Sequence, residues 1–375
     1  MKILFITPGC FDKGGISRYS RYQITALREL YGNNNVRVLS LLGPKNGDFE
    51  VPFEVYWNGK GADAASKIKL VLLTCWLLIS WRPKILHTAH INLSGFTHFL
   101  GKLLGATTIL NIYGLEIWSN PSKDALYGLR KTEHVISDCY YTARYVKENN
   151  LREKNNVHVI WDCVDTERFF PGTPDASVLA LYNVPDPETH FNIVTLGRLS
   201  KTAAHKGYDR LIRAFAKLGG GFSQARLIIA GKGDNVDYYK ELAQKEHVFD
   251  RVVFTGMIAE KDLPDIYRSA SVFSLVSDRG PNRGEGIPLT PLEAMACAIP
   301  ILVGNQDGSQ EAVIENQNGF VLDPFDLERH AACIRELITN PTLLTYKKEM
   351  AKKISTEFFS YSDFLKKTKV VYEKI

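Results

Sequence analysis

Short apolar runs alternate with longer amphipathic stretches along most of the chain. The runs have the length of buried strands, and the longer stretches repeat apolar residues at helical spacing. A helix is expected to begin near Ser17, for example, with apolar positions at Tyr19, Tyr22 and Ala26. This alternation is typical of α/β proteins with parallel sheets. The runs of the first half cover residues 3–7, 36–42, 85–88, 108–112, 135–137 and 157–161.

The pattern lapses near the middle of the chain, where prolines at positions 171–187 disfavour helix and strand and indicate a linker. A second series of runs then covers residues 191–196, 225–230, 252–255, 272–276 and 301–303, with helical patterns near 208–218, 238–246, 291–298 and 327–339. A length of 375 residues suits two domains at roughly 150 residues each. We therefore expect an N-terminal domain over 1–165, a linker over 166–190, a C-terminal domain over 191–355 and a C-terminal helix over 356–375.

Both halves have a Rossmann-like pattern. The predicted fold is α/β, with two Rossmann-like domains that face each other across a cleft and a C-terminal helix that can cross back to the first domain. Open parallel sheets bind ligands at the carboxyl ends of their strands. The loops that follow the apolar runs are therefore the places to look for chemistry.

Composition narrows the classes of function. Hydrophobic residues make up 45% and charged residues 23%, which is the ordinary mix of a globular protein and excludes a disordered or coiled-coil chain. The formal charge of +5 is spread over the whole length without a basic tract, which argues against nucleic-acid binding. The six cysteines form no C-x-x-C pair, so neither a zinc ribbon nor a dithiol site is indicated.

Two apolar segments bear on location. The run after Lys2 is shorter than the roughly 7–15 residues of a signal-peptide core, so a cytoplasmic protein is expected. Residues 70–79 (LVLLTCWLLI) are flanked by Lys67, Lys69 and Arg82. This run is also shorter than the roughly 17–25 residues of a spanning helix. Two interpretations stay open: a helix packed in the core, or a helix that touches an anionic membrane surface peripherally.

Basic residues and glycines follow the first strands of the C-terminal half. Arg198 lies in a Gly-Arg-Leu-Ser turn after residues 191–196, and Lys206-Gly207 precedes a helix. Backbone N–H groups at a helix N-terminus attract phosphate, and Arg and Lys add full charges. These residues indicate an anion site, or else a solvated basic loop. Gly231, in Ala-Gly-Lys-Gly-Asp after the next strand, either lets a ligand approach the backbone or only forms a turn.

Two glutamates occur in the segment RGEGIPLTPLEAMACAIP. Glu285 lies on a loop between Gly284 and Gly286, and Glu293 lies early in the helix that follows. A carboxylate near a helix N-terminus can be a plain dipole or capping residue. That explanation suffices for Glu293 alone, but it does not explain the whole pattern.

The ordered set of these motifs resembles the retaining, two-Rossmann-domain (GT-B) glycosyltransferases of family four, over nearly the whole chain. The resemblance rests on the spacing of Glu285 and Glu293, the PLEAMAC run, the GRLS…KG loop and Gly14-Gly15 after the first strand. The stretches HINL (90–93) and GLEIW (114–118) are similar to members that assemble bacterial polysaccharides. Residues 306–313 (QDGSQEAV) resemble the loop that follows the donor site.

The resemblance implies a role for each matching residue. Glu285, Arg198, Lys206 and His90 would be catalytic: Arg198 and Lys206 would hold the donor diphosphate, Glu285 would face the donor sugar and His90 would lie beside that sugar. Donor-binding positions would be Gly15, Gly231, Met257, Gly286, Leu289, Thr290 and Glu293, with Glu293 on the ribose and Met257 beside the base.

The chain also departs from the family pattern. Pro288 stands in a loop where a second glycine is common, and proline has no N–H to donate. Tyr113 precedes Gly114 where the family commonly has histidine, so Tyr113 and Glu116 are expected on the acceptor side. No Asp-x-Asp motif suits a metal-bound diphosphate, so we expect no metal and no cofactor.

The predicted function is hexose transfer from a nucleotide diphosphate sugar to an acceptor hydroxyl with retention of the anomeric configuration. The expected acceptor is a glycan or lipid-linked glycan, in cell-surface polysaccharide or glycolipid assembly at the inner face of the membrane. Two alternatives stay open. One is a nucleotide-sugar epimerase or hydrolase, since fold does not fix function. The other is a non-catalytic nucleotide-sugar-binding subunit of a transferase complex.

Overall fold

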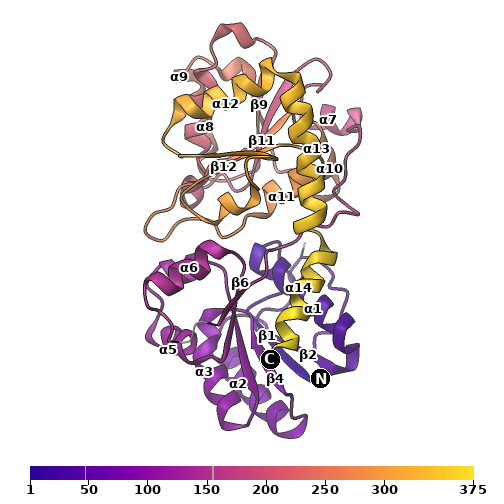
Figure 1. Ribbon diagram of the computed structural model, residues 1–375, viewed down its shortest axis with the longest axis vertical. Helices are drawn as coiled ribbons and strands as arrows, with labels where there is room; N and C mark the ends of the chain where they lie inside the picture. Colours follow the sequence, from indigo (N-terminus) through magenta and orange to yellow (C-terminus); the bar gives the residue numbers. More distant parts are fainter. Residues whose placement is uncertain (47, 154–155) are drawn as a thin grey trace. The chain divides into compact units, whose positions relative to one another are not determined.

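A computed structural model of the protein describes residues 1–46, 48–153 and 156–375. The chain divides into two compact units, the first comprising Met1–Cys163 and Tyr361–Ile375 and the second Val164–Ser360. Each unit is a parallel sheet with helices on both of its faces (Figure 1). The predicted α/β fold with two Rossmann-like domains is therefore confirmed. The C-terminal helix belongs to the first unit, so the chain returns there after completing the second.

The first unit contains a seven-stranded sheet in the order β3-β2-β1-β4-β5-β6-β7. Its strands are β1 (Ile3–Thr7), β2 (Val36–Ser40), β3 (Trp57–Asn58), β4 (Ile85–Thr88), β5 (Thr107–Ile112), β6 (His134–Ser137) and β7 (Val157–Val159). Its helices are α1 (Gly15–Tyr31), α2 (Ala64–Ser80), α3 (Ser94–Leu103), α4 (Leu115–Trp118), α5 (Lys123–Lys131), α6 (Tyr140–Glu148) and α14 (Tyr361–Glu373), with 3-10 turns η1 (Asn33–Asn35) and η2 (Ile91–Leu93).

Alternation along β1 separates the two cores of this unit. Phe5 packs in a cluster with Leu27 of α1 and Phe364 of α14. Its neighbour Leu4 points to the other face and packs with Leu77 of α2. Because successive side chains of a strand point to opposite faces, a strand covered on both sides is apolar throughout. All five residues of β1 are buried, as this arrangement requires.

The second unit contains a six-stranded sheet in the order β10-β9-β8-β11-β12-β13. Its strands are β8 (Phe191–Leu196), β9 (Ala225–Ala230), β10 (Val252–Gly256), β11 (Val272–Leu275), β12 (Ile301–Gly304) and β13 (Gly319–Leu322). Its helices are α7 (Ala176–Leu181), α8 (Tyr208–Ala216), α9 (Val236–Lys245), α10 (Leu263–Arg268), α11 (Leu289–Ala296), α12 (Leu327–Thr339) and α13 (Pro341–Phe358), with 3-10 turns η3 (Lys201–Lys206), η4 (Gly220–Phe222), η5 (Phe249–Arg251), η6 (Glu260–Asp262) and η7 (Gly308–Ala312).

The segment 166–190, expected as a linker, packs within the second unit. It contains α7, and the hydroxyl of Tyr182 donates to Asp262 Oδ2 at 2.8 Å. Phe169 makes an edge contact with the ring of Tyr267, with ring centroids 5.7 Å apart. The proline pattern identified an irregular segment, but its buried aromatic rings attach it to the domain that follows.

Strand order decides which loops meet in the second unit. β8 lies between β9 and β11, and β12 pairs with the other side of β11. The loops after β8, β11 and β12 therefore leave neighbouring strands at the same edge of the sheet. Among the described residues, no helix combines the length and apolar character needed to cross a bilayer.

Candidate active site

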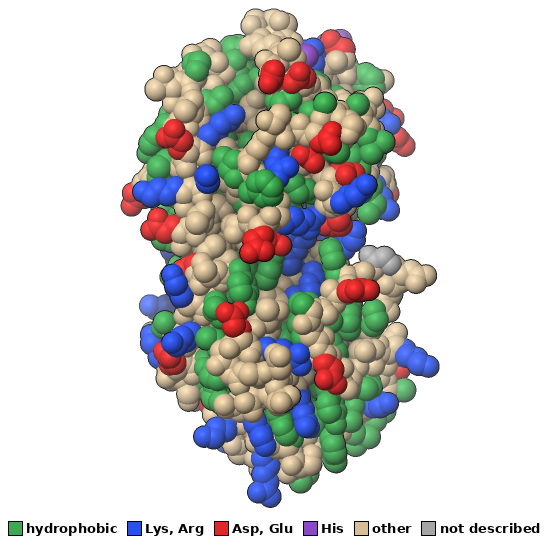
Figure 2. Space-filling view, turned by 90° about the vertical axis from the view of Figure 1, so that its right-hand side faces the viewer, with side chains coloured by type: hydrophobic (Ala, Val, Ile, Leu, Met, Phe, Trp, Pro, Cys, Tyr) green, Lys and Arg blue, Asp and Glu red, His purple; other side chains and the backbone are tan. Residues whose placement is uncertain are grey.

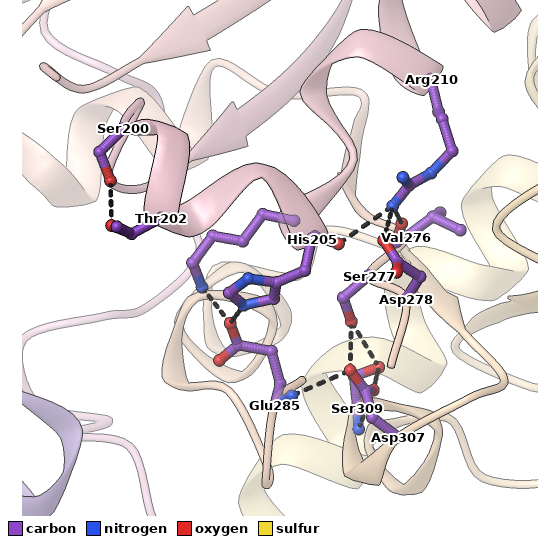
Figure 3. A network of polar contacts seen from close by, with 11 residues as sticks. Ser200, Thr202, His205, Arg210, Val276, Ser277, Asp278, Glu285, Asp307 and Ser309 are labelled. Carbon is purple, nitrogen blue, oxygen red and sulfur yellow. Dashed lines mark hydrogen bonds and ion pairs between the residues drawn. The ribbon is translucent and has the colours of Figure 1, made fainter. Parts of the chain in front are cut away.

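The candidate site of the second unit centres on the carboxylate of Glu285. Nζ of Lys206 lies 2.6 Å from Glu285 Oε1, and Nε2 of His205 lies 2.8 Å from the same oxygen. The lysine and histidine come from the end of η3, after β8, while Glu285 lies on the loop that follows β11 (Figure 3). Two residues separated by almost 80 positions thus meet because their strands are neighbours.

Gly207 fixes the place of His205 and Lys206. It adopts φ +80° between η3 and α8, and an added Cβ would lie 2.6 Å from the carbonyl oxygen of Val276. A side chain here would therefore clash with the backbone after β11 as well as strain its own backbone. The glycine lets the turn that carries the two cations lie directly against the strand that leads to Glu285.

Glu285 is ionised in this environment. Burial works to raise the pKa of its carboxyl group, but the charge of Lys206 and the hydrogen bonds from His205 and Lys206 outweigh it and lower the pKa to about 2. A carboxylate can only accept hydrogen bonds, so His205 donates to it from Nε2. The site therefore holds a fixed negative charge beside a fixed positive one, which suits the recognition of polar, charged ligands.

The loop that carries Glu285 is anchored by a chain of ion pairs. Arg210 Nη2 lies 2.7 Å from Asp278 Oδ1, and Arg283 Nη2 lies 2.8 Å from Asp278 Oδ2. Gly280 and Arg283 exchange two backbone hydrogen bonds of 3.2 Å, which close a tight turn between these residues. Glu285 follows this turn directly, so the turn restricts where its backbone can lie.

The remaining basic and glycine positions lie on the loops after β8 and β9. Arg198 is exposed on the loop after β8. Gly231 adopts φ +135°, and a Cβ there would lie 1.9 Å from the carbonyl oxygen of Gly197. The loops after β8 and β9 therefore approach each other so closely that only glycine fits at position 231. This explains Gly231 by packing between loops, while its predicted contact with the donor stays a prediction.

The two ends of the PLEAMAC segment lie in different environments. Leu289 and Thr290, half-buried, are the first residues of α11, where backbone N–H groups have no partner within the helix. Glu293 is buried one turn later, and its Oε2 accepts a hydrogen bond of 2.7 Å from the hydroxyl of Tyr267. Gly286 is half-buried beside Glu285, and Met257 is exposed after β10. The ligand contacts expected of these residues stay predictions.

The structure also places the predicted residues of the first unit. Gly15 is the first residue of α1, and Gly14 caps this helix without a side-chain hydrogen bond. Burial lowers the pKa of His90, and the charge of Glu116 opposes that shift. Glu116 Oε1 in turn accepts a hydrogen bond of 2.6 Å from the backbone N–H of Tyr113.

The side chain of Tyr113 is buried within the first unit, and its predicted role on the acceptor side stays a prediction. The residue is 9% exposed, and its hydroxyl accepts a hydrogen bond of 3.2 Å from Asn111 Nδ2 inside the unit. Its backbone, rather than its ring, borders Glu116. No group of three His, Cys, Asp or Glu side chains with the arrangement of a metal site occurs within the described parts of the chain.

Sequence reasoning missed two members of the site, His205 and Asp307. His205 directly precedes Lys206, and a titratable residue beside a predicted phosphate ligand after a strand was a usable signal. Asp307 follows β12, and its Oδ2 accepts a hydrogen bond of 3.0 Å from the backbone N–H of Glu285. It lay inside the recognised QDGSQEAV stretch, but nothing in the local pattern distinguished it from an ordinary turn aspartate.

Comparisons with known sequences match the domain that carries this cluster. Residues 183–356 match the family model described as glycosyl transferases group 1. The chain is 35% identical over 191 residues to mannosylfructose-phosphate synthase of Agrobacterium fabrum, an alignment that covers 49% of this chain and 40% of that protein. It is 33% identical over 178 residues to a GDP-mannose-dependent α-(1-6)-phosphatidylinositol monomannoside mannosyltransferase of Mycobacterium tuberculosis, covering 47% and 45%. The matched segment thus spans less than half of these curated relatives.

Comparisons with solved structures extend over the whole chain. HepE of Anabaena, solved in complex with UDP, superposes with a TM-score of 0.80 at 16% identity and covers 100% of both chains. Sucrose-phosphate synthase from Thermosynechococcus elongatus superposes with a TM-score of 0.76 at 18% identity, covering 100% of this chain and 99% of that one. At this level of identity the likeness shows the fold, which is that of GT-B glycosyltransferases.

Proposed function

We propose that the protein is a retaining glycosyltransferase, because residues 183–356 match the family model of glycosyl transferases group 1 and the chain has the GT-B fold. It moves a hexose from a nucleotide diphosphate sugar to an acceptor hydroxyl. The observation that carries the proposal is the cluster of Glu285, Lys206 and His205 at the carboxyl ends of β8 and β11, inside the matched domain.

The chemistry of the departing diphosphate follows from the charges of the site. Breaking the bond between the sugar and the diphosphate leaves negative charge on the leaving group and positive charge on the sugar ring. Lys206 and Arg198, with the N–H groups at the start of α11, stabilise the diphosphate. These groups supply the required positive charge, so we propose that the reaction proceeds without a metal.

The ionised carboxylate of Glu285 serves the other half of the reaction. It faces the donor sugar and interacts favourably with the positive charge that grows on the ring in the transition state. Its ion pair with Lys206 also keeps the ammonium group at the site before the donor arrives. Glu293 binds the ribose, and His90 and Glu116 act on the side of the transferred sugar and acceptor.

Candidate donors come from the names of the relatives. The mycobacterial relative is GDP-mannose-dependent, and HepE is described in complexes with UDP and with UDP-glucose. A screen of UDP-glucose, GDP-mannose and related nucleotide sugars by thermal shift should identify the donor, since a ligand that binds only the folded state raises the melting temperature. Transfer assays with the donor found there then test the reaction, and wild-type protein that forms no glycoside with any donor would contradict the proposal.

The hydrolase or epimerase alternative is separated by incubating the donor without an acceptor. A transferase releases free hexose slowly under these conditions, because water replaces the acceptor poorly. Rapid formation of free hexose or of an epimer would favour the alternative. A non-catalytic subunit would bind the nucleotide sugar and release no nucleoside diphosphate with any acceptor.

We also propose that the protein contacts an anionic membrane surface, at the inner face of the plasma membrane, through α2 and α3. Residues Ile68, Leu72, Trp76 and Ile79 of α2 are 51–63% exposed, and they lie at helical spacing along one side. Leu70 and Leu77 are buried on the opposite side. One face of α2 therefore packs in the core, and we propose that the other face touches the membrane. The neighbouring helix α3 also carries exposed apolar residues, namely Phe99 and Leu103.

This α2–α3 apolar face has the composition of a peripheral membrane contact. Lys67, Lys69 and Lys102 belong to the same two helices and provide positive charge for anionic lipid. A contiguous exposed apolar surface usually marks an interaction site. Basic, acidic and hydrophobic side chains are interspersed on the face of the molecule drawn in Figure 2. The membrane contact supports a lipid-linked or glycan acceptor in cell-surface polysaccharide or glycolipid assembly.

A further inference from the structure

Asp307 is a buried carboxylate behind the Glu285 loop. The residue is 0% exposed and lies between β12 and η7. Its Oδ2 accepts hydrogen bonds from the backbone N–H of Glu285 at 3.0 Å and from the hydroxyl of Ser277 at 2.8 Å. Its Oδ1 accepts from the backbone N–H and the hydroxyl of Ser309, at 3.1 and 2.5 Å (Figure 3).

The same loop holds Glu285 at a second point. The backbone N–H of Gly308 donates to the carbonyl oxygen of Glu285 at 3.0 Å. Asp307 and Gly308 therefore bind both polar groups of the Glu285 backbone, while His205 and Lys206 bind its side chain. The backbone of Glu285 is thus held by the loop after β12, and its carboxylate is held by the turn after β8.

The arrangement requires a carboxylate at position 307. Four donors converge on its two oxygens, and an ionised carboxylate is the side chain that can accept at both. Asparagine has one acceptor oxygen, so it would turn an NH₂ group toward either the Glu285 N–H or the Ser309 N–H. A second carboxylate close to Glu285 is also unfavourable, because burial and the charge of Glu285 both raise the pKa of Asp307. The repulsion between the carboxylates of Asp307 and Glu285 would bring no benefit to a loop whose only role was to stabilise the fold.

We propose that Asp307 is a positioning residue that holds the backbone of Glu285 so that its carboxylate stays at the reacting sugar. The role rests on the proposed function of Glu285. Full burial keeps Asp307 from touching a substrate, so it acts on the reaction through the backbone of Glu285 that it holds. Misplacing a reacting group by about 1 Å can cost about 10²-fold in rate even when the changed residue is remote from the chemistry.

A double-mutant cycle in hexose transfer tests this role. Asp307→Asn should lower kcat by about 10- to 10²-fold, with the KM of the donor changed much less. In the Glu285→Gln background the same substitution should lower kcat less than about twofold, because the carboxylate that Asp307 positions is already absent. Steady-state rates are measured at raised enzyme concentration, with the donor still in excess, so that slow variants stay readable.

Asp262→Asn is the matched control. Asp262 is also a buried aspartate of the second unit, and it accepts a hydrogen bond from Tyr182. This variant should lose stability while keeping kcat. If Asp307→Asn does not fold, Ser277→Ala removes a donor to the same Oδ2 atom and should lower kcat severalfold, again only when Glu285 is present.

The outcomes separate the two claims. A wild-type protein that transfers no hexose overturns the proposed function and with it this role. If the wild type transfers hexose normally, two results overturn only the role of Asp307. One is a wild-type kcat in Asp307→Asn, and the other is a double variant whose loss of kcat equals the product of the two single losses. A kcat loss in Asp262→Asn equal to that in Asp307→Asn would also overturn it, because general destabilisation would then explain both.

Discussion

Each unit has a cluster of polar side chains, in the sheet of the first unit and in the loops at the sheet edge of the second, and the two clusters differ in charge and in burial. In the first unit His87 Nε2 contacts Asn111 Oδ1 at 2.9 Å, Nδ1 contacts the hydroxyl of Tyr372, and Asn111 donates to Gln23 at 2.6 Å. Burial lowers the pKa of His87 to about 3, so the ring is neutral. In the second unit His205 contacts an ionised glutamate and a lysine lies beside it.

The comparison shows how a structural cluster differs from a candidate active site. The His87 cluster pairs both ring nitrogens with neutral partners and joins α14 to the sheet, which stabilises the first unit. The Glu285 cluster keeps opposite charges near the end of a sheet, in half-buried loops where a ligand can bind. Neutral hydrogen-bonded groups inside a unit stabilise its fold, whereas charged groups at strand ends are candidates for chemistry.

The largest expected effect is the loss of turnover when a cation of the second unit is removed. Lys206→Ala and Arg198→Ala should each lower kcat by about 10²–10³-fold, because each removes a charge that stabilises the departing diphosphate. The melting temperature should change little for exposed Arg198. Steady-state transfer assays measure both variants, with Lys201→Ala, an exposed lysine of the same turn, as the control. Wild-type turnover in either variant would end the assignment.

The two glutamates should separate kinetically. Glu285→Gln should lower kcat by about 10²-fold with a smaller effect on donor binding, because positive charge grows on the sugar only in the transition state. Glu293→Gln should mainly raise the KM of the donor, since the ribose does not change during the reaction. Affinity for the nucleoside diphosphate is measured for both. Equal losses of this affinity with unchanged kcat would contradict the two roles.

The His87 cluster should affect stability instead of turnover. His87→Phe leaves partners of the imidazole unpaired, and each stranded buried group costs about 1–3 kcal/mol of the free energy of unfolding. The kcat per folded molecule should stay at the wild-type value. His247→Asn, at an exposed histidine, is the control for denaturant unfolding. A loss of kcat with unchanged stability would assign His87 to the active site.

Stability should also fall in acid because of His87. Below pH 6.5 the unfolded state binds a proton at this histidine, while the folded state binds it only near pH 3. The unfolding free energy therefore falls as the pH is lowered through this window, by at most about 1.4 kcal/mol per pH unit for one histidine. Above pH 5 Glu285 contributes little to this pH dependence, since the pKa of its carboxyl group has its ordinary value in the unfolded state and is about 2 in the folded state. A smaller slope in His87→Phe than in the wild type, between pH 6.5 and 5, is the expected result.

The smallest effect concerns the α2–α3 apolar face. Leu72→Ser with Trp76→Ser should reduce flotation with anionic vesicles and leave transfer to a soluble acceptor unchanged. Salt should weaken the wild-type contact, since charge attraction is screened within about 8–10 Å at physiological ionic strength. Leu181→Ser, at an exposed leucine of the second unit, is the control. If the wild type does not float with anionic vesicles at low salt, the proposed membrane contact is wrong and α2 serves only to pack the core.

Sequence patterns predicted the parts of the fold that depend on buried strands. β1 and β8 match their predicted ranges, because fully covered parallel strands are continuously apolar. Edge strands β3 and β13 were missed, since Trp57–Asn58 is only two residues long and Gly319–Leu322 stands in a polar, glycine-containing stretch. The packing of residues 166–190 was also missed, because it depends on distant partners such as Asp262.

The sequence predicted those site residues that are charged and lie in a loop directly after a predicted strand. Glu285 and Lys206 each stand in a loop after an apolar run, and neighbouring strands bring such loops together. The position of His205 beside Lys206 offered a signal, but the contacts of His205 and Asp307 with Glu285 could not be predicted in this way. Their contacts with Glu285 depend on the backbone of η3 and on the turn after β12, and a sequence pattern carries no information on either geometry.

The anomeric configuration of the transferred sugar tests the central claim most directly. The product of the best donor and acceptor pair is purified, and the one-bond carbon–proton coupling at its anomeric carbon is measured by NMR. UDP-glucose and GDP-mannose are both α-linked donors, so a retaining enzyme must give an α-glycoside. We predict an α-linked product from the wild type, and a β-linked product would contradict the account.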